Sequence, residues 1–258
     1  METGQHKALQ LASGRPSPLF PSDEIVLAAG ARYAPDQFEA YVPEALGPCD
    51  PVAAGGVCGV VASRFERMGE PTRLEARGLS ADASGRPSNL TDFRIHPPPA
   101  ARRIPTIAVL GTSMNTGKTT AAAHLVRGLA LSDLKVGAAK VTGTGAPGDL
   151  ASMRDAGAIA ALDFGDAGYA TTFLLDLPAL EAVFVTLTDA LVAEGAEVAV
   201  LEVADGLLQR ETAMLVGSPV FKSRVDTVLF AAGDAMGRRA GSVSSRPTDF
   251  RWRRSPGS

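Results

Sequence analysis

The sequence predicts an α/β protein in which a doubly wound, mostly parallel sheet is preceded by a small mixed or β-rich domain. From Ile104 onward, short apolar runs alternate with helical segments, which is typical of a parallel sheet covered on both faces. Before this region, the residues His96-Pro-Pro-Pro-Ala-Ala-Arg-Arg stiffen the chain and mark a boundary. We therefore expect a flexible arm over 1–22, a small domain over 23–96, a proline-rich linker over 97–103, the α/β domain over 104–236 and an irregular tail over 237–258.

Composition narrows the class of protein. The chain has 258 residues, of which 45% are hydrophobic, and this is ample for a buried core. A net charge of -3 with scattered basic residues favours neither nucleic acid nor an anionic membrane surface as a partner. No apolar run is long enough to span a bilayer, and the first residues lack an apolar secretory core, so we expect a cytoplasmic protein with free thiols at Cys49 and Cys58. A homodimer is kept as a hypothesis.

The first hundred residues give weak signals. Glycine and prolines at 14–21 argue against regular structure in the arm. Residues 25–30 and 57–63 have the composition of strands, and residues 35–42 that of a short helix with Pro35 in its first turn.

Alternating polar and apolar residues over 71–79, followed by a turn at 83–87, indicate a hairpin. Four residues could line a substrate site, although ordinary surface roles are favoured for them: Tyr33, Tyr41, Arg64 and Arg73.

A phosphate-binding loop is the strongest signal in the α/β part. An apolar run from Ile107 leads into a glycine-containing loop, and an alanine-rich segment that favours helix follows. Backbone N–H groups in such a loop and at a helix start can surround phosphates, with Lys118 reaching the terminal phosphates and the Thr119 hydroxyl holding Mg²⁺. A structural glycine turn is the alternative. The residues expected to bind the nucleotide are Gly111, Thr112, Asn115, Thr116, Gly117, Lys118, Thr119 and Thr120.

The elements after the loop helix continue the alternation. Strands are predicted over 135–143, 158–163, 197–206 and 225–235, with helices over 150–156 and 177–192. The strand before Gly206 is apolar until Glu202, and Asp205 follows it at the strand's end. Since a buried carboxylate is costly without a partner, we expect at least one of these acids to join Thr119 in a Mg²⁺ shell. Helix capping or surface charge is the alternative, and Asp205 is placed to cap the next helix.

The last residues differ in composition. Residues 237–258 are rich in Arg, Ser, Gly and Pro and lack apolar periodicity. An irregular basic tail and a truncated or out-of-frame end both fit.

The loop has five residues between Gly111 and Gly117-Lys118-Thr119, one more than the usual pattern. In this it resembles dethiobiotin synthetase and the cobyrinic acid a,c-diamide synthases, which share the fold of the MinD and signal-recognition GTPases. The resemblance covers residues 104–235 and implies ATP and Mg²⁺ as cofactors. It also implies functional roles for Lys140, in Lys-Val-Thr-Gly, and for Glu202, in Glu-Val-Ala-Asp-Gly. The family's loop aspartate is replaced by Ser113 and the proline after its strand lysine by Val141.

Two functional hypotheses follow. The first is an ATP-dependent enzyme that activates a small carboxylate, amine or alcohol by phosphoryl transfer, with Lys118, Lys140 and Glu202 as catalytic residues. Lys140 would position the acceptor or an anionic intermediate. The second is a nucleotide-dependent switch or chaperone-like ATPase that acts on a protein partner. ATP is favoured over GTP because no Asn/Thr-Lys-x-Asp motif follows the fifth strand. The layout of a small N-terminal domain before such a loop also resembles, in architecture, the family that includes a D-glutamate N-acetyltransferase.

Overall fold

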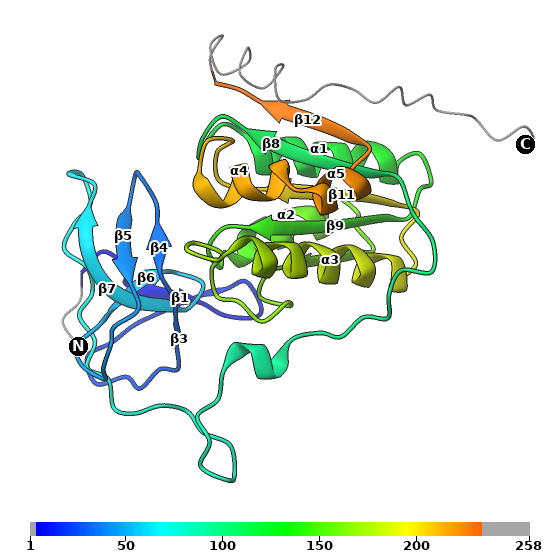
Figure 1. The fold of residues 1–258 in the computed structure, drawn as a ribbon. Helices are drawn as coiled ribbons and strands as arrows, with labels where there is room; N and C mark the ends of the chain where they lie inside the picture. The colour runs from blue at the N-terminus through cyan, green and yellow to red at the C-terminus, as the bar shows by residue number, and fades with distance from the viewer. Residues whose placement is uncertain (1–3, 234–258) are drawn as a thin grey trace, which may run out of the picture.

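A computed structural model describes residues 4–233 of the chain, which form a small β-rich domain beside an α/β domain (Figure 1). Residues 1–3 of the predicted arm and the whole predicted tail, 237–258, lie outside the described residues. Of the helices in the described part, none is long and apolar enough to cross a membrane.

The α/β domain is built on a five-stranded sheet whose described pairings are all parallel. Its order is β10-β9-β11-β8-β12, so the chain winds outward in both directions from the middle of the sheet. This confirms the predicted doubly wound class. The strands are β8 (Thr106–Gly111), β9 (Val136–Thr142), β10 (Ala160–Asp163), β11 (Val198–Val203) and β12 (Thr227–Ala231).

Helices cover both faces of this sheet (Figure 1). One face carries α1 (Lys118–Ala130) and α2 (Pro147–Asp155), and the other carries α3 (Leu177–Ala193), α4 (Arg210–Gly217) and α5 (Pro219–Arg224). Side chains alternate between the two resulting cores: Leu201 packs with the α3 core and its neighbour Val200 with the α1 core. The continuous apolar run in β11 follows from this burial on both sides.

The small domain is organised around its longest strand, β7 (Val57–Arg64). The main sheet has the order β3-β7-β5-β4, and β6 also pairs with β7. A separate two-stranded hairpin precedes it. The remaining strands are β1 (Ala8–Gln10), β2 (Pro16–Pro18), β3 (Ala28–Ala29), β4 (Arg32–Tyr33), β5 (Phe38–Tyr41) and β6 (Asp50–Ala53).

The predicted helix over 35–42 is wrong. Residues Pro35 and Asp36 instead form the turn between β4 and β5, and the Ala34 N–H donates to the Phe38 carbonyl oxygen. Proline suits a tight turn as well as it suits a first helical turn. The decisive pattern is the alternation in β5, where Phe38 and Ala40 are fully buried while Glu39 and Tyr41 point outward.

The structure also differs from the predicted arm. Besides the hairpin of β1 and β2, the segment is tied to the small domain through Thr72, whose hydroxyl donates to the His6 carbonyl oxygen at 2.6 Å and accepts from the Gly4 N–H at 2.9 Å. The His6 ring lies 5.5 Å from the Phe38 ring, measured between centroids. Prolines at 16 and 18 are tolerated because β2 pairs on one side only.

A long connection joins the two domains. The predicted turn at 83–87 is present, with Ala81 opposite Pro87 and the Asp82 N–H donating to the Arg86 carbonyl oxygen, but no strand forms over 71–79. After η1 (Leu90–Phe93), the chain reaches the amino end of the parallel sheet, where Arg103 forms an ion pair of 2.6 Å with Asp226. Cys49 and Cys58 are free thiols, as predicted.

His6 is half-buried beside Phe38, and this position makes the stability of the fold depend on pH. Desolvation, with the nearby Arg32 charge, lowers the pKa of His6 from 6.5 to about 4. Between pH 6.5 and 4, His6 is therefore protonated in the unfolded chain but not in the folded chain. We expect the free energy of unfolding to fall as pH drops through this range. His6→Phe keeps a ring against Phe38 and should flatten this dependence in urea titrations, whereas exposed His96→Phe should not. Identical pH profiles for wild type and His6→Phe would contradict a lowered pKa of the half-buried His6.

Candidate nucleotide-binding site

The predicted phosphate-binding loop has the expected strand–loop–helix geometry. Residues 112–117 connect β8 to α1, and Gly117 precedes the helix with φ of 87°, a left-handed conformation that glycine adopts without strain. Asn115 is also left-handed, with φ of 62°. No side chain in the described chain caps the first turn of α1, so its backbone N–H groups remain available to an anion.

Lys118 is held over this loop. Its side chain is 5% exposed, and Nζ donates to the Ser113 carbonyl oxygen at 2.7 Å. The Thr116 hydroxyl donates to the same carbonyl at 2.9 Å, which fixes the curl of the loop. Burial lowers the pKa of Lys118, so the ammonium is poorly compensated and would gain from a bound phosphate.

Glu202 lies on β11, the strand that pairs with β8, and its side chain contacts the start of α1. The Thr119 hydroxyl donates to Glu202 Oε1 at 3.0 Å, while Oε2 is buried and has no hydrogen-bond partner among residues 4–233. Desolvation raises the pKa of Glu202, against the opposing effect of the Lys140 charge. A buried carboxylate oxygen without a partner is costly, so this position favours a bound cation.

Asp205 is a second acid near the loop, and it lines one cleft together with Lys118, Thr119 and Glu202. Burial raises its pKa, and the charges of Lys140, Lys118 and Arg32 oppose the shift. The capping alternative is wrong, because Gln209 is the N-cap of α4 and the Asp205 N–H instead donates to Gln209 Oε1 at 3.0 Å.

These donors fit Mg²⁺. Thr119, Glu202 and Asp205 offer only oxygen atoms, the ligands that this hard cation prefers. Within residues 4–233, no group of three or more His, Cys, Asp or Glu side chains could hold a metal by itself. This agrees with a Mg²⁺ ion that takes most of its ligands from phosphates and water, as is usual in such sites.

Lys140 stands at the centre of the acidic residues. Glu202 lies beside Lys140 in the sheet register. The Lys140 ammonium forms an ion pair with Asp149 from the first turn of α2. Desolvation disfavours the ammonium, but Glu202 and Asp149 together outweigh this effect and raise the pKa of Lys140. Asp149 was not predicted from the sequence, although it is the one acid among residues 144–149, which follow β9.

A cleft of about 500 Å³ gathers these groups. Its lining includes most of the predicted site residues: Asn115, Gly117, Lys118, Thr119, Thr120, Lys140, Glu202 and Asp205. Gly111, Thr112 and Thr116 are not among the lining residues. The Gly111 carbonyl oxygen accepts from the Leu207 N–H, and the Thr112 N–H donates to the Ala231 carbonyl oxygen. We call this space the nucleotide cleft.

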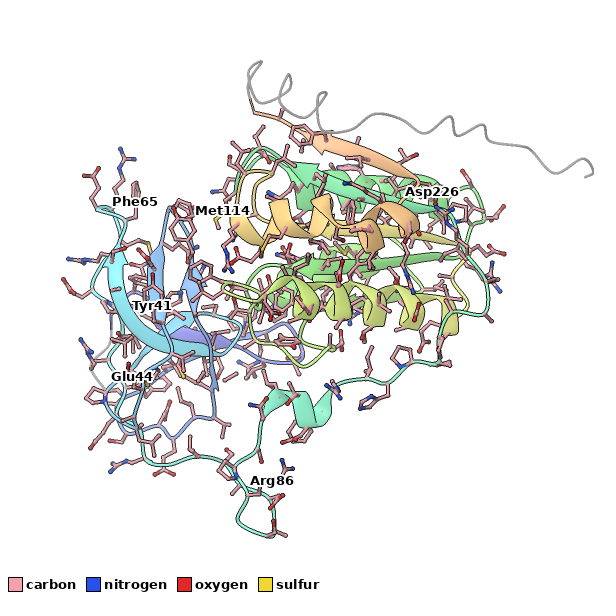
Figure 2. All side chains as sticks on the ribbon, viewed as in Figure 1. Tyr41, Glu44, Phe65, Arg86, Met114 and Asp226 are labelled. Atoms are coloured by element: carbon pink, nitrogen blue, oxygen red, sulfur yellow. The ribbon has the colours of Figure 1, made fainter. Side chains whose placement is uncertain are left out.

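The small domain closes one side of the nucleotide cleft with Arg32, Tyr33 and Gln37. Asn115 Nδ2 donates to Asp36 Oδ2 at 2.8 Å and joins the loop to the β4–β5 turn. Figure 2 shows Met114 on the edge of the α/β domain that faces the small domain, and Asp226 at the opposite edge.

Of the four small-domain residues considered from the sequence, only Tyr33 lines the nucleotide cleft. The Tyr41 ring lies 6.4 Å from that of Phe173, and Arg64 and Arg73 form ion pairs with Glu70 and Asp50.

Comparisons with known proteins give a weak structural similarity. No family model matches the sequence, and no curated protein matches it. Solved structures with a similar fold include the signal recognition particle receptor FtsY from Elizabethkingia anophelis (16% identity, TM-score 0.41, covering 62% of this chain and 53% of that one). FtsY from Thermotoga maritima (17%, 0.41, 61% and 54%) is another.

A third is the signal recognition particle 54 kDa protein from Aeropyrum pernix K1 in complex with GDP (16%, 0.35, 56% and 39%). The chain thus spans about half the length of the two FtsY chains and less of the third. Similarity of this degree assigns neither a family nor an activity.

The carboxylate arrangement predicts a Mg²⁺ dependence. Glu202→Gln and Asp205→Asn keep the shape of each side chain but remove its charge, so at least one should abolish the effect of Mg²⁺ on nucleotide affinity. Glu197→Gln is the matched control, because Glu197 precedes the same strand at the opposite edge, where its side chain accepts from the Lys135 N–H at 3.0 Å. Calorimetric nucleotide titrations with and without Mg²⁺ measure this. An unchanged Mg²⁺ effect in both variants would remove these acids from the metal shell.

Proposed function

We propose that the protein binds a nucleoside triphosphate with Mg²⁺ and transfers its terminal phosphoryl group to a small acceptor molecule. The observation that carries the proposal is the convergence of Lys118, the first turn of α1 and the Thr119–Glu202 pair in one cleft. Phosphoryl transfer needs positioning and charge neutralisation more than covalent chemistry, and these groups supply both.

Each group has a role in this proposal. The uncapped N–H groups of α1 and Lys118 would bind the phosphates, while Thr119, Glu202 and Asp205 would hold Mg²⁺. Mg²⁺ supplies charge neutralisation on the phosphate oxygens. Lys140, already paired with Asp149, would contribute positive charge near the acceptor without being free to move.

ATP is the proposed nucleotide, because the sequence lacks a guanine-reading motif after the fifth strand. GTP is the second candidate, and two of the structurally similar proteins were solved with GDP. The affinities for ATP and for GTP should therefore be measured side by side.

Lys118→Ala tests the site. Losing one charge-assisted hydrogen bond to phosphate should weaken nucleotide binding by about 10- to 100-fold while the fold is kept. The control is Lys135→Ala, since Lys135 is an exposed lysine at the other end of the sheet. Calorimetry with ATP and GTP gives the affinities, and circular dichroism checks the fold. Equal affinity in wild type and folded Lys118→Ala would eliminate the proposed phosphate site.

The second candidate function is a nucleotide-dependent switch, which the Asn115–Asp36 hydrogen bond favours. Because Asn115 lies in the phosphate-binding loop and Asp36 in the β4–β5 turn, a change in the loop on nucleotide binding would reach the small domain directly. A switch hydrolyses nucleotide slowly without any acceptor, whereas the proposed enzyme does so mainly when the acceptor is present.

Hydrogen exchange distinguishes the two functions. For a switch, nucleotide should change amide protection over residues 32–41, and Asn115→Ala should abolish this response while nucleotide still binds. The control is Asn89→Ala, because Asn89 is the only other asparagine of the sequence and lies in the connection between the domains. This variant should leave the response intact. No change in protection over 32–41 on nucleotide binding by the wild type would argue against the switch.

A further inference from the structure

A second cavity of about 500 Å³ adjoins the nucleotide cleft, and we call it the acceptor cavity. Most of its polar side chains come from the small domain: Gln5, His6, Gln10, Arg32, Asp36 and Gln37. Arg32 and Gln37 line both spaces, together with Thr144 and Ala146 of the α/β domain. A molecule in the acceptor cavity would therefore lie next to the nucleotide.

The wall between the domains is closely packed. A Cβ atom at Gly55 would lie 2.1 Å from the Gly145 carbonyl oxygen, so the two backbones touch at this point. Neighbouring Ala54, by contrast, is exposed and lines the acceptor cavity. The cavity is thus bounded by both domains, and the small domain supplies its charged and amide groups.

Arg32 is the central cation of the acceptor cavity. It lies on the edge strand β4, is 9% exposed, and donates to the Val52 carbonyl oxygen and, at 2.8 Å, to Gln37 Oε1. Among residues 4–233, no carboxylate lies within ion-pairing distance of it. Asp205 and Asp36 act on it electrostatically from farther away, and burial lowers its pKa.

A buried guanidinium without an ion pair is unusual, because removing a charge from water is costly unless an opposite charge replaces the water. Arginine has five N–H donors in a planar fork, and the two hydrogen bonds above use two of them. The remaining donors can bind a planar carboxylate with two parallel hydrogen bonds.

The other groups limit the ligand further. Three glutamine amides make the cavity polar, and Asp36 Oδ1 has no hydrogen-bond partner in the described part of the chain. His6 is neutral at pH 7, since its pKa is about 4, and leaves Arg32 as the positive group. A volume of about 500 Å³ suits a metabolite-sized molecule.

We propose that the acceptor cavity binds a small polar carboxylate through Arg32, and that this carboxylate is the acceptor substrate class. The acceptor role rests on the proposed phosphoryl transfer, whereas carboxylate binding itself does not. An alternative source of the same negative charge is the terminal phosphate of the nucleotide.

Calorimetry on the full-length protein tests the proposal with acetate, succinate and malate as probes, and with neutral succinamide as the control ligand. Each is titrated into protein without nucleotide and with a non-hydrolysable ATP analogue. We expect at least one carboxylate to bind and succinamide not to bind. Arg32→Gln should weaken that binding by about 10- to 100-fold, whereas Arg64→Gln, which removes a paired arginine of the same domain, should not.

Ala54→Leu keeps the proposal testable if Arg32→Gln fails to fold. A leucine at this exposed position should fill the cavity mouth and weaken carboxylate binding, while ATP affinity is unchanged. If the wild type does not bind nucleotide, the proposed function is overturned, but the carboxylate titration without nucleotide still tests the acceptor cavity. The carboxylate proposal is overturned if no probe binds, if Arg32→Gln or Ala54→Leu leaves the binding intact, or if Arg32→Gln weakens only triphosphate binding.

Discussion

The structure depends on one constraint: a parallel sheet buried on both faces can present polar groups only where its strands end. The strands β8, β9 and β11 run side by side, and helices cover both of their faces. Polar residues therefore appear where these strands end and in the loops that follow. Lys118, Lys140 and Glu202, which are far apart in the sequence, meet at this edge for that reason.

The same edge concentrates charge at an energetic cost. Burial lowers the pKa of Lys118 and raises the pKa values of Glu202 and Asp205, so the charged form of each group is less stable here than in water. Lys140 is the exception, because two acids stabilise its ammonium. An arrangement in which several charges are under-compensated stores the capacity to bind ions of the opposite sign, and it is typical of sites selected for function over stability.

Much of the α/β domain could be predicted from the sequence because its segments are long and strongly patterned. The continuous apolar run of β11 and the glycine loop before Lys118 are local signals that later packing does not override. The small domain gave poorer predictions, since most of its strands have two to four residues and Pro35 fits a turn and a helix equally well.

Apart from Tyr33, the residues that the small domain contributes to the site could not be predicted. Arg32, Asp36 and Gln37 stand some eighty residues before the phosphate-binding loop, and nothing in their local sequence indicates that they face it. Their position depends on how β4 and β5 pair and on how the two domains meet. Asp149 would have been easier to predict, since it is an acid that follows β9 by a few residues at the binding edge of the sheet.

The route of the connection has a consequence for how the domains stay together. The chain leaves the small domain after Leu74, whose backbone pairs with Cys49. It then passes below α3 and enters β8 from the edge far from the contact with Asn115 (Figure 1). Its last residues are fastened there by Arg102 to the Ala196 carbonyl oxygen at 2.7 Å and by the Arg103–Asp226 ion pair. The connection therefore keeps the small domain near the cleft, so the contact between the two domains forms within one chain. Individually weak contacts, such as the Asn115–Asp36 hydrogen bond, therefore act together to hold the small domain against the nucleotide cleft.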